Sequence, residues 1–182
     1  MSPQVLQTLL GRIPTMTKPA YLHNYIRYPV KDHVYPGIIP CSKSSNHHGD
    51  KGIVEGILLS GLTKNEIKIF DWFEDTDYKR CIEDIHIILK DSKHGDHLQK
   101  SDISDNEKRE EIVKANVYVW IAGNDLLEIV SDCTGNDDDK IYNDWSYNNF
   151  QQVKLEKYLK DTVKPCRLEI DHLAILENGM EE

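Results

Sequence analysis

The residue best placed for acid–base chemistry in this sequence is a glutamate that follows a run of aromatic residues. Glu74 ends the segment Ile-Phe-Asp-Trp-Phe-Glu and stands with Ile67 and Phe70 at i, i+3 and i+7, on one face of an expected helix. A carboxylate on a buried face is desolvated, which raises its pKa towards the value needed to accept and return a proton near neutral pH. The alternative is that the helix ends before Glu74 and the side chain points into water.

Two other carboxylates near Glu74 have simpler interpretations. Asp71 could pair with Lys68 or Arg80, or cap the helix end. Glu55 lies within Ile-Val-Glu-Gly-Ile, where it could face a cavity, although the polar side of an alternating strand is favoured.

Neither the histidines nor the cysteines form a recognisable metal motif. The histidines cluster at His47 and His48 and at His94 and His97, in polar loops that lack ligands at helical or strand spacing. The four cysteines are widely separated in sequence and are expected to be reduced thiols in the cytoplasm. We therefore expect no metal and no cofactor, and a phosphate-binding loop is also missing between residues 49 and 56.

Length and charge narrow the class of protein. The chain has 182 residues, 22 Lys and Arg, 31 Asp and Glu, and a formal charge of −9. This length suits a single domain over residues 1–182. Acidic residues outnumber basic ones and no block of basic residues is present, which argues against nucleic acid as a partner. No apolar run approaches the ~20 residues that span a bilayer, so no membrane partner is expected either.

The elements that position Glu74 can be read from helix caps and strand patterns. Ser2, Pro3 and Gly11 mark the start and end of a first helix, and residues 63–66 form a capping box that opens a helix to about Phe73. Strands are expected near 20–28, 33–39, 52–61, 78–89 and 117–121, with an interruption near 83–84. A charged loop insertion at about 91–114, a helix around 146–160 and a C-terminal tail from about 163 complete the chain.

The order of these elements predicts the fold class. Helices and strands do not alternate as βαβ units would, so a doubly wound sheet is disfavoured. An α+β fold with a curled mixed sheet or small barrel, flanked by helices, fits this order better.

Several motifs together resemble one family. The sequence is similar to the γ-glutamylcyclotransferase-like family, in its avirulence-induced, plant-type branch, over roughly residues 1–160. The most specific part is a Phe-Glu-x-x-x-Tyr-x-Arg block after a Gly-Leu-Thr turn. The motifs are Tyr35-Pro36-Gly37-Ile38-Ile39-Pro40, residues 54–63 (Val-Glu-Gly-Ile-Leu-Leu-Ser-Gly-Leu-Thr), residues 71–80 (Asp-Trp-Phe-Glu-Asp-Thr-Asp-Tyr-Lys-Arg), residues 117–120 (Val-Tyr-Val-Trp) and Asp144-Trp145.

The resemblance implies a mixed β-barrel that encloses a pocket for a small-molecule γ-glutamyl substrate. In this family the α-amine of the substrate attacks its own γ-carbonyl and yields 5-oxoproline and a free amine, without a cofactor. The family's catalytic glutamate matches Glu74. Tyr78, Tyr118, Pro36 and Gly37 match substrate-binding positions, although ordinary packing is an equal interpretation of the two tyrosines.

One departure from the family pattern affects this expectation. Family members begin with a strand and a Tyr-Gly-Ser/Thr-Leu loop before the first helix, and both are missing before Ser2. Backbone amides of that loop suit a carboxylate or an oxyanion. The sequence therefore reads as a member without its front end, expected to be less stable and poorly active. The alternative function is a catalytically impaired binding or stress-response module.

Overall fold

In the part of the chain that the structure describes, the strands form two separate antiparallel sheets. The computed structural model describes residues 1–41, 52–89, 109–129 and 145–179. One sheet has four strands in the order β4-β1-β5-β6, and the other pairs β2 with β3. The strands are β1 (Thr15–His23), β2 (Tyr25–Pro29), β3 (Pro36–Pro40), β4 (Ile53–Ser60), β5 (Tyr78–Leu89) and β6 (Arg109–Trp120).

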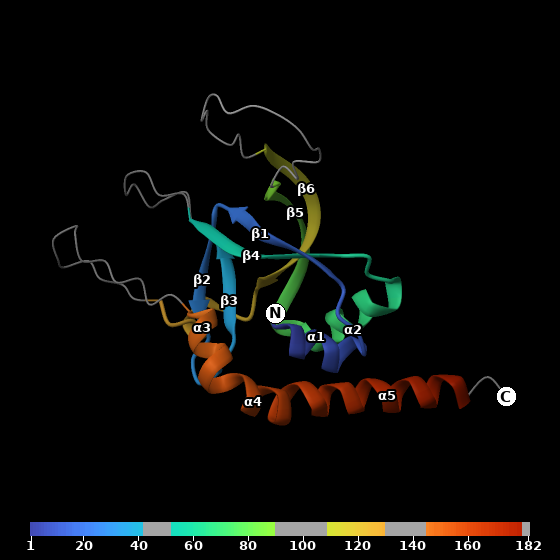
Figure 1. The fold of residues 1–182 in the computed structure, drawn as a ribbon. Helices are drawn as coiled ribbons and strands as arrows, with labels where there is room; N and C mark the ends of the chain where they lie inside the picture. Colours follow the sequence, from blue (N-terminus) through green and yellow to red (C-terminus); the bar gives the residue numbers. More distant parts are fainter. Residues whose placement is uncertain (42–51, 90–108, 130–144, 180–182) are drawn as a thin grey trace, which may run out of the picture.

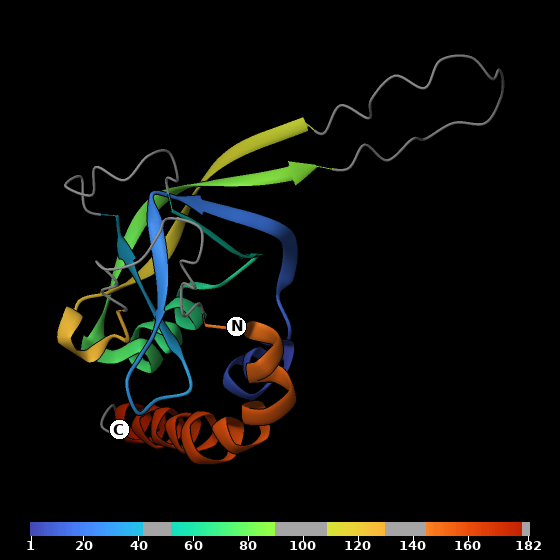
Figure 2. The same cartoon turned by 90° about the vertical axis from the view of Figure 1, so that its left-hand side faces the viewer.

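The helices gather at one end of the strands. They are α1 (Pro3–Leu10), α2 (Lys64–Glu74), α3 (Tyr147–Asn149), α4 (Leu155–Tyr158) and α5 (Lys164–Gly179). In Figure 1, α1 and α2 lie between the four-stranded sheet and the long α5, which runs below them. Figure 2 shows the β5–β6 ribbon extending away from this body.

The two predicted helices that flank the site are confirmed, and their capping residues explain their bounds. The Ser2 hydroxyl accepts a hydrogen bond from the Val5 amide, and α1 stops at Gly11, whose φ of 73° lies in the left-handed region. In α2, the capping box is present: Thr63 accepts from the Glu66 amide, while Glu66 accepts from the Thr63 amide.

The α+β class is confirmed, but the described residues form no closed barrel and every strand pair is antiparallel. The expected strand over 20–28 is in fact divided at Asn24, which has a φ of 66°. Asparagine tolerates this left-handed conformation, and it turns the chain out of the four-stranded sheet. As a result β2 pairs with β3 instead of continuing β1.

The expected interruption near residues 83–84 is also wrong. The β5–β6 register continues from the pair Tyr78 and Trp120 to the pair Leu89 and Arg109 without a shift. Glu83 accepts from the Tyr25 hydroxyl at 2.8 Å and Asp84 accepts from Lys114 at 2.8 Å, so both carboxylates are satisfied within a regular strand. Residues 109–114 of the expected insertion belong to β6, while 90–108 lie outside the described residues.

The C-terminal helices contain π-helical turns that change which side chains are buried. These turns span Phe150–Lys154 and Leu159–Val163. A π turn places residues five apart above one another, and Phe150 and Leu155 are buried with this spacing. Val153, which an ordinary helix would bury beside Phe150, is 71% exposed. The expected tail after Val163 is the helix α5.

The helices share one hydrophobic core beneath the sheet. It contains Val5, Leu6 and Leu9 of α1, Phe70 of α2, and residues of the C-terminal helices. Arg167 of α5 donates to the Leu9 carbonyl at 2.6 Å, which satisfies a carbonyl at the end of α1. Among the described residues, no helix is both long and apolar enough to cross a membrane.

Candidate active site around Glu74

Glu74 occupies the junction between α2 and β5. It is the last residue of α2, and Asp75 follows with a φ of 53°, beginning a single 3₁₀ turn that ends at Asp77. Strand β5 begins at Tyr78. This tight connection holds Glu74 and Tyr78 close together, at the base of the four-stranded sheet.

The Glu74 carboxyl is half-buried, and its surroundings favour the protonated form. Burial raises its pKa to about 7, while the nearby α-amino group of Met1 acts in the opposite direction. The same burial lowers the pKa of the Met1 amine. Because α2 includes Glu74 and its side chain is only partly exposed, the interpretation of a water-facing residue beyond a helix end is not supported.

Several tyrosines surround Glu74. Burial, together with the Glu74 charge, raises the pKa of Tyr78 and Tyr158 above the ordinary value for a phenol. The pKa of Tyr35 is also raised, by burial and by the charges of Asp77 and Glu74. The rings of Tyr35 and Tyr158 lie 6.2 Å apart. These phenols stay neutral at physiological pH, and the Tyr78 hydroxyl is bonded to the Pro36 carbonyl.

A cavity of about 550 Å³ opens beside Glu74. Its walls come from β1, β4, β5, β6 and α2, and most of them are apolar. The polar and charged lining residues include Glu74, Arg80, Lys114 and Tyr118. A concave, largely apolar space of this size with a few convergent polar groups is typical of a small-molecule site.

A chain of polar contacts connects the cavity wall to α2. The Tyr118 hydroxyl donates to Oδ1 of Asp71 at 2.8 Å, and Nε of Arg80 lies 3.3 Å from the same oxygen. Burial raises the pKa of Tyr118, and the hydrogen bond to Asp71 adds to this effect. Of the partners expected for Asp71, the structure selects Arg80. Glu55, in contrast, is exposed on β4.

The structure divides the predicted substrate-binding residues into two groups. Tyr118 lines the cavity with Glu74. Tyr78, Pro36 and Gly37 are not among the residues that line it, and the Tyr78 hydroxyl donates to the Pro36 carbonyl at 2.9 Å. A Cβ at Gly37 would stand 3.0 Å from atoms of Trp120 and Leu127, so this glycine permits close packing.

Sequence reasoning did not single out two residues beside the glutamate. Tyr158 comes from α4, whose apolar pattern is obscured by the π turns on either side of it. Met1 lines the cavity and stands two residues before the start of α1 at Pro3, so the positive end of that helix dipole lies near the same space. The helix-start residues Ser2 and Pro3 were the signal in the sequence that places the start of a helix next to Met1.

Comparison with known proteins identifies the family. The sequence model described as "Gamma-glutamyl cyclotransferase, AIG2-like" matches residues 1–146. The chain belongs to this family. Glu74, Tyr78 and Tyr118 fall within the matched region of this AIG2-like chain, whereas Tyr158 and α5 lie beyond it.

Several plant proteins are similar to this AIG2-like chain. AIG2-like protein D of Arabidopsis thaliana is 30% identical over 162 residues, which cover 89% of this chain and 80% of that protein. AIG2-like protein C of the same organism is 26% identical over 162 residues, covering 89% and 70%. The solution structure of an Arabidopsis thaliana protein superimposes with a TM-score of 0.48 at 25% identity, over 88% of this chain and 72% of that one.

Proposed function

We propose that this protein is a γ-glutamylcyclotransferase-type acyltransferase. Its substrate is a γ-glutamyl amine or γ-glutamyl amino acid. The α-amino nitrogen of the γ-glutamyl group attacks the γ-carbonyl carbon and forms the five-membered ring of 5-oxoproline. The bond between the γ-carbon and the leaving nitrogen breaks, and a free amine departs. We place the reaction in the cytoplasm, in keeping with the free thiols of Cys41, Cys81 and Cys166.

The observation that carries this proposal is the carboxyl of Glu74 at the cavity wall, with its pKa raised by burial to about 7. One carboxyl must act first as a base and then as an acid in this reaction. As a base, Glu74 takes a proton from the attacking amine, and as an acid it returns a proton to the leaving nitrogen. A pKa near the working pH makes both steps accessible to the same group.

The charges around the cavity match the polar end of a γ-glutamyl group. Arg80 and the N-terminal end of α1 favour the α-carboxylate of the substrate. We propose that Tyr118 contacts the substrate directly, since its side chain lines the same wall as Glu74. The apolar lining, which includes Leu58, Ile67 and Phe70, suits a leaving group with apolar surface.

We propose a positioning role for the remaining predicted site residues. Tyr78 lies close enough to Glu74 for that charge to raise its pKa, but its hydroxyl is bonded to the Pro36 carbonyl. This bond connects the start of β5 to the start of β3. Gly37 allows the chain next to Pro36 to approach Trp120 closely. Together these residues hold the end of α2 at a fixed place.

The test measures 5-oxoproline released from a panel of γ-glutamyl amines and γ-glutamyl amino acids. Glu74→Gln is expected to lower kcat/KM by about 100-fold to 10,000-fold, as removal of a general acid–base group does. The matched control is Glu55→Gln, because Glu55 is an exposed glutamate of β4 that does not line the cavity. Equal rates in wild type and Glu74→Gln would remove Glu74 from the mechanism.

The alternative function, a catalytically impaired binding or stress-response module, is tested by the same panel. It takes the place of the enzyme proposal if no compound yields 5-oxoproline while isothermal titration still detects binding of a γ-glutamyl compound. Loss of that binding in a variant with a bulkier cavity wall, Leu58→Trp, would assign the binding to this cavity.

A further inference from the structure

Two histidines and a glutamate that are far apart in the sequence meet on the four-stranded sheet. His86 of β5 pairs with Tyr21 of β1 on one side and with Ile112 of β6 on the other. His23 lies two residues from Tyr21 along β1, and Glu110 lies two residues from Ile112 along β6. Side chains two apart on a strand share a face, so His23 and Glu110 stand on the same face as His86.

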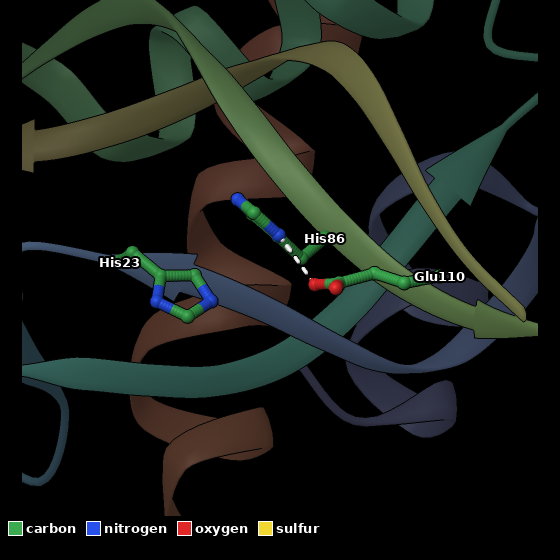
Figure 3. A group of neighbouring side chains, drawn as sticks. All are labelled: His23, His86 and Glu110. Carbon is green, nitrogen blue, oxygen red and sulfur yellow. Dashed lines mark hydrogen bonds and ion pairs between the residues drawn. The ribbon is translucent and has the colours of Figure 1, made fainter. Parts of the chain in front are cut away.

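The side chains of these three residues converge (Figure 3). Nδ1 of His86 lies 2.6 Å from Oε1 of Glu110, and the ring centroids of His23 and His86 are 4.2 Å apart. One potential ligand atom from each residue lies within 4.8 Å of the others. In a tetrahedral zinc site with bonds of about 2.0–2.1 Å, ligand atoms stand about 3.4 Å apart, so rotations of these side chains close the remaining gap.

The residues have the freedom that such rotations need. His23 is the last residue of β1, and the chain turns away from the sheet at Asn24. Glu110 is exposed over 59% of its side chain, while His86 is held more firmly, with 23% exposed. The arrangement therefore has one fixed ligand in the middle and two adjustable ligands beside it.

We propose that His23, His86 and Glu110 bind one divalent transition-metal ion, with zinc as the reference ion. Two imidazole nitrogens and one carboxylate oxygen favour zinc, nickel or copper over calcium and magnesium, which prefer ligand sets made of oxygen alone. Water completes the coordination. A metal bound at Nδ1 of His86 takes the place of the contact between that nitrogen and Glu110, and the neutral ring then carries its hydrogen on Nε2.

This site differs from the Glu74 cavity and does not depend on the proposed reaction. The residues next to these histidines, Leu22 and Ile85, are buried and line that cavity, and Tyr21 lines it too, whereas none of His23, His86 and Glu110 is among its lining residues. The metal would join three strands: β1, β5 and β6. Its expected effect is to stabilise the sheet, because a ligand that binds only the folded state opposes unfolding.

The experiment titrates zinc into the full chain, without any affinity tag, in competition with a chromogenic chelator. We expect one ion per chain. Replacement of a ligand, as in His23→Gln, His86→Gln or Glu110→Gln, is expected to weaken zinc binding by at least about tenfold. The matched control is His33→Gln, because His33 is an exposed histidine bonded to the Lys31 carbonyl. Its zinc affinity should equal that of wild type.

A second background removes competing histidines. His47, His48, His94 and His97 lie outside the described residues, and all four are replaced with glutamine. Zinc binding that persists in this background and disappears with His86→Gln supports the proposal. Loss of binding in the background itself would overturn it, as would unchanged binding in both His23→Gln and His86→Gln.

Thermal melting and cobalt spectroscopy give readouts that do not depend on catalysis. Zinc should raise the Tm of wild type and of His33→Gln but not that of His23→Gln, whose metal-free Tm confirms that it folds. Cobalt should bind without the intense bands of thiolate ligation. Equal stabilisation by magnesium or calcium, or a thiolate spectrum, would show that this trio is not the site and that His86 and Glu110 form an ordinary ion pair.

Discussion

The hydroxyl of Tyr118 donates a hydrogen bond of 2.8 Å to Asp71, three residues before Glu74 on α2. The two residues connect the β6 wall of the cavity to the helix that carries the candidate base. Arg80 holds the same carboxylate from β5. The position of Glu74 thus depends on a strand distant in sequence, through contacts that the helix does not make by itself.

Tyr118→Phe tests this connection. Loss of one hydrogen bond to a carboxylate should raise KM about threefold to tenfold with little change in kcat, because Arg80 still holds Asp71. Tyr78→Phe is the comparison, since Tyr78 does not line the cavity. It should lower the Tm and leave KM unchanged. Steady-state kinetics and melting curves of both variants measure the difference, and the reverse pattern would assign substrate contact to Tyr78.

The pH dependence of turnover should report Glu74. Its pKa, raised by burial to about 7, makes the carboxylate form scarce in acid. We expect kcat/KM to rise with pH and to level off above an apparent pKa near 7, because the free enzyme must begin with an ionised base. A profile that is flat between pH 5 and 8 would indicate another base.

The same carboxyl should make stability depend on pH. The folded pKa of about 7 exceeds the ordinary glutamate value of 4.5, so the folded state binds the proton more tightly than the unfolded state. Its contribution to stability is complete below about pH 4.5 and is lost as pH rises through 7. Relative to Glu74→Gln, the free energy of unfolding of wild type should fall by about 3 kcal/mol between pH 4.5 and pH 8. Urea titrations of the two proteins measure it.

Glu66 should show the opposite pH dependence. Hydrogen bonds from Arg12 and from the Thr63 amide lower the pKa of Glu66 to about 2, below its ordinary 4.5. Its contribution is present above about pH 4.5 and is lost as pH falls towards 2. Glu66→Gln should cost about 1–2 kcal/mol at pH 7, because it weakens the cap that starts α2. Lys68→Gln, an exposed change on the same helix, should cost much less.

Gly37→Ala should destabilise the protein without altering the chemistry of Glu74. The added methyl group would stand 3.0 Å from Cβ and Cγ of Trp120, in a core that has little freedom to move. We expect a loss of about 1–3 kcal/mol from overpacking. Chemical denaturation measures it, and activity should persist at temperatures where the variant remains folded. A variant as stable as wild type would mean that Trp120 can shift.

Local signals in the sequence predicted the elements that carry Glu74. The capping box of residues 63–66 and the Ser2 cap each act within one helical turn, so the sequence alone reveals them. The π turns were not predicted, because the residues they bury, Phe150 and Leu155, stand five apart and do not follow the spacing of an ordinary helix. Asn24 was missed because a left-handed residue in an aromatic segment reads as a continuous strand.

Only part of the candidate site could be predicted from the sequence. Helical spacing placed Glu74 on the face of Phe70 but left a water-facing position open, and the family resemblance is what favoured Glu74 as the catalytic residue. Tyr158 and the pair His23 and His86 were not found, because only the tertiary fold brings them beside Glu74 or beside each other. Residues that meet across strands leave no periodic signal within one segment.

Leu22 and His23 are neighbours on β1, and their alternation links the cavity to the histidine cluster through one strand. Leu22 lines the cavity, and His23 next to it belongs to the histidine cluster, so one strand contributes to both places. A ligand that binds in the cavity or a metal ion that binds at the histidines would make β1 more rigid. Less conformational entropy would then be lost when the other one binds. Linkage requires the effect to be mutual: whatever factor a metal ion adds to the affinity of a cavity ligand, that ligand adds to the affinity of the metal.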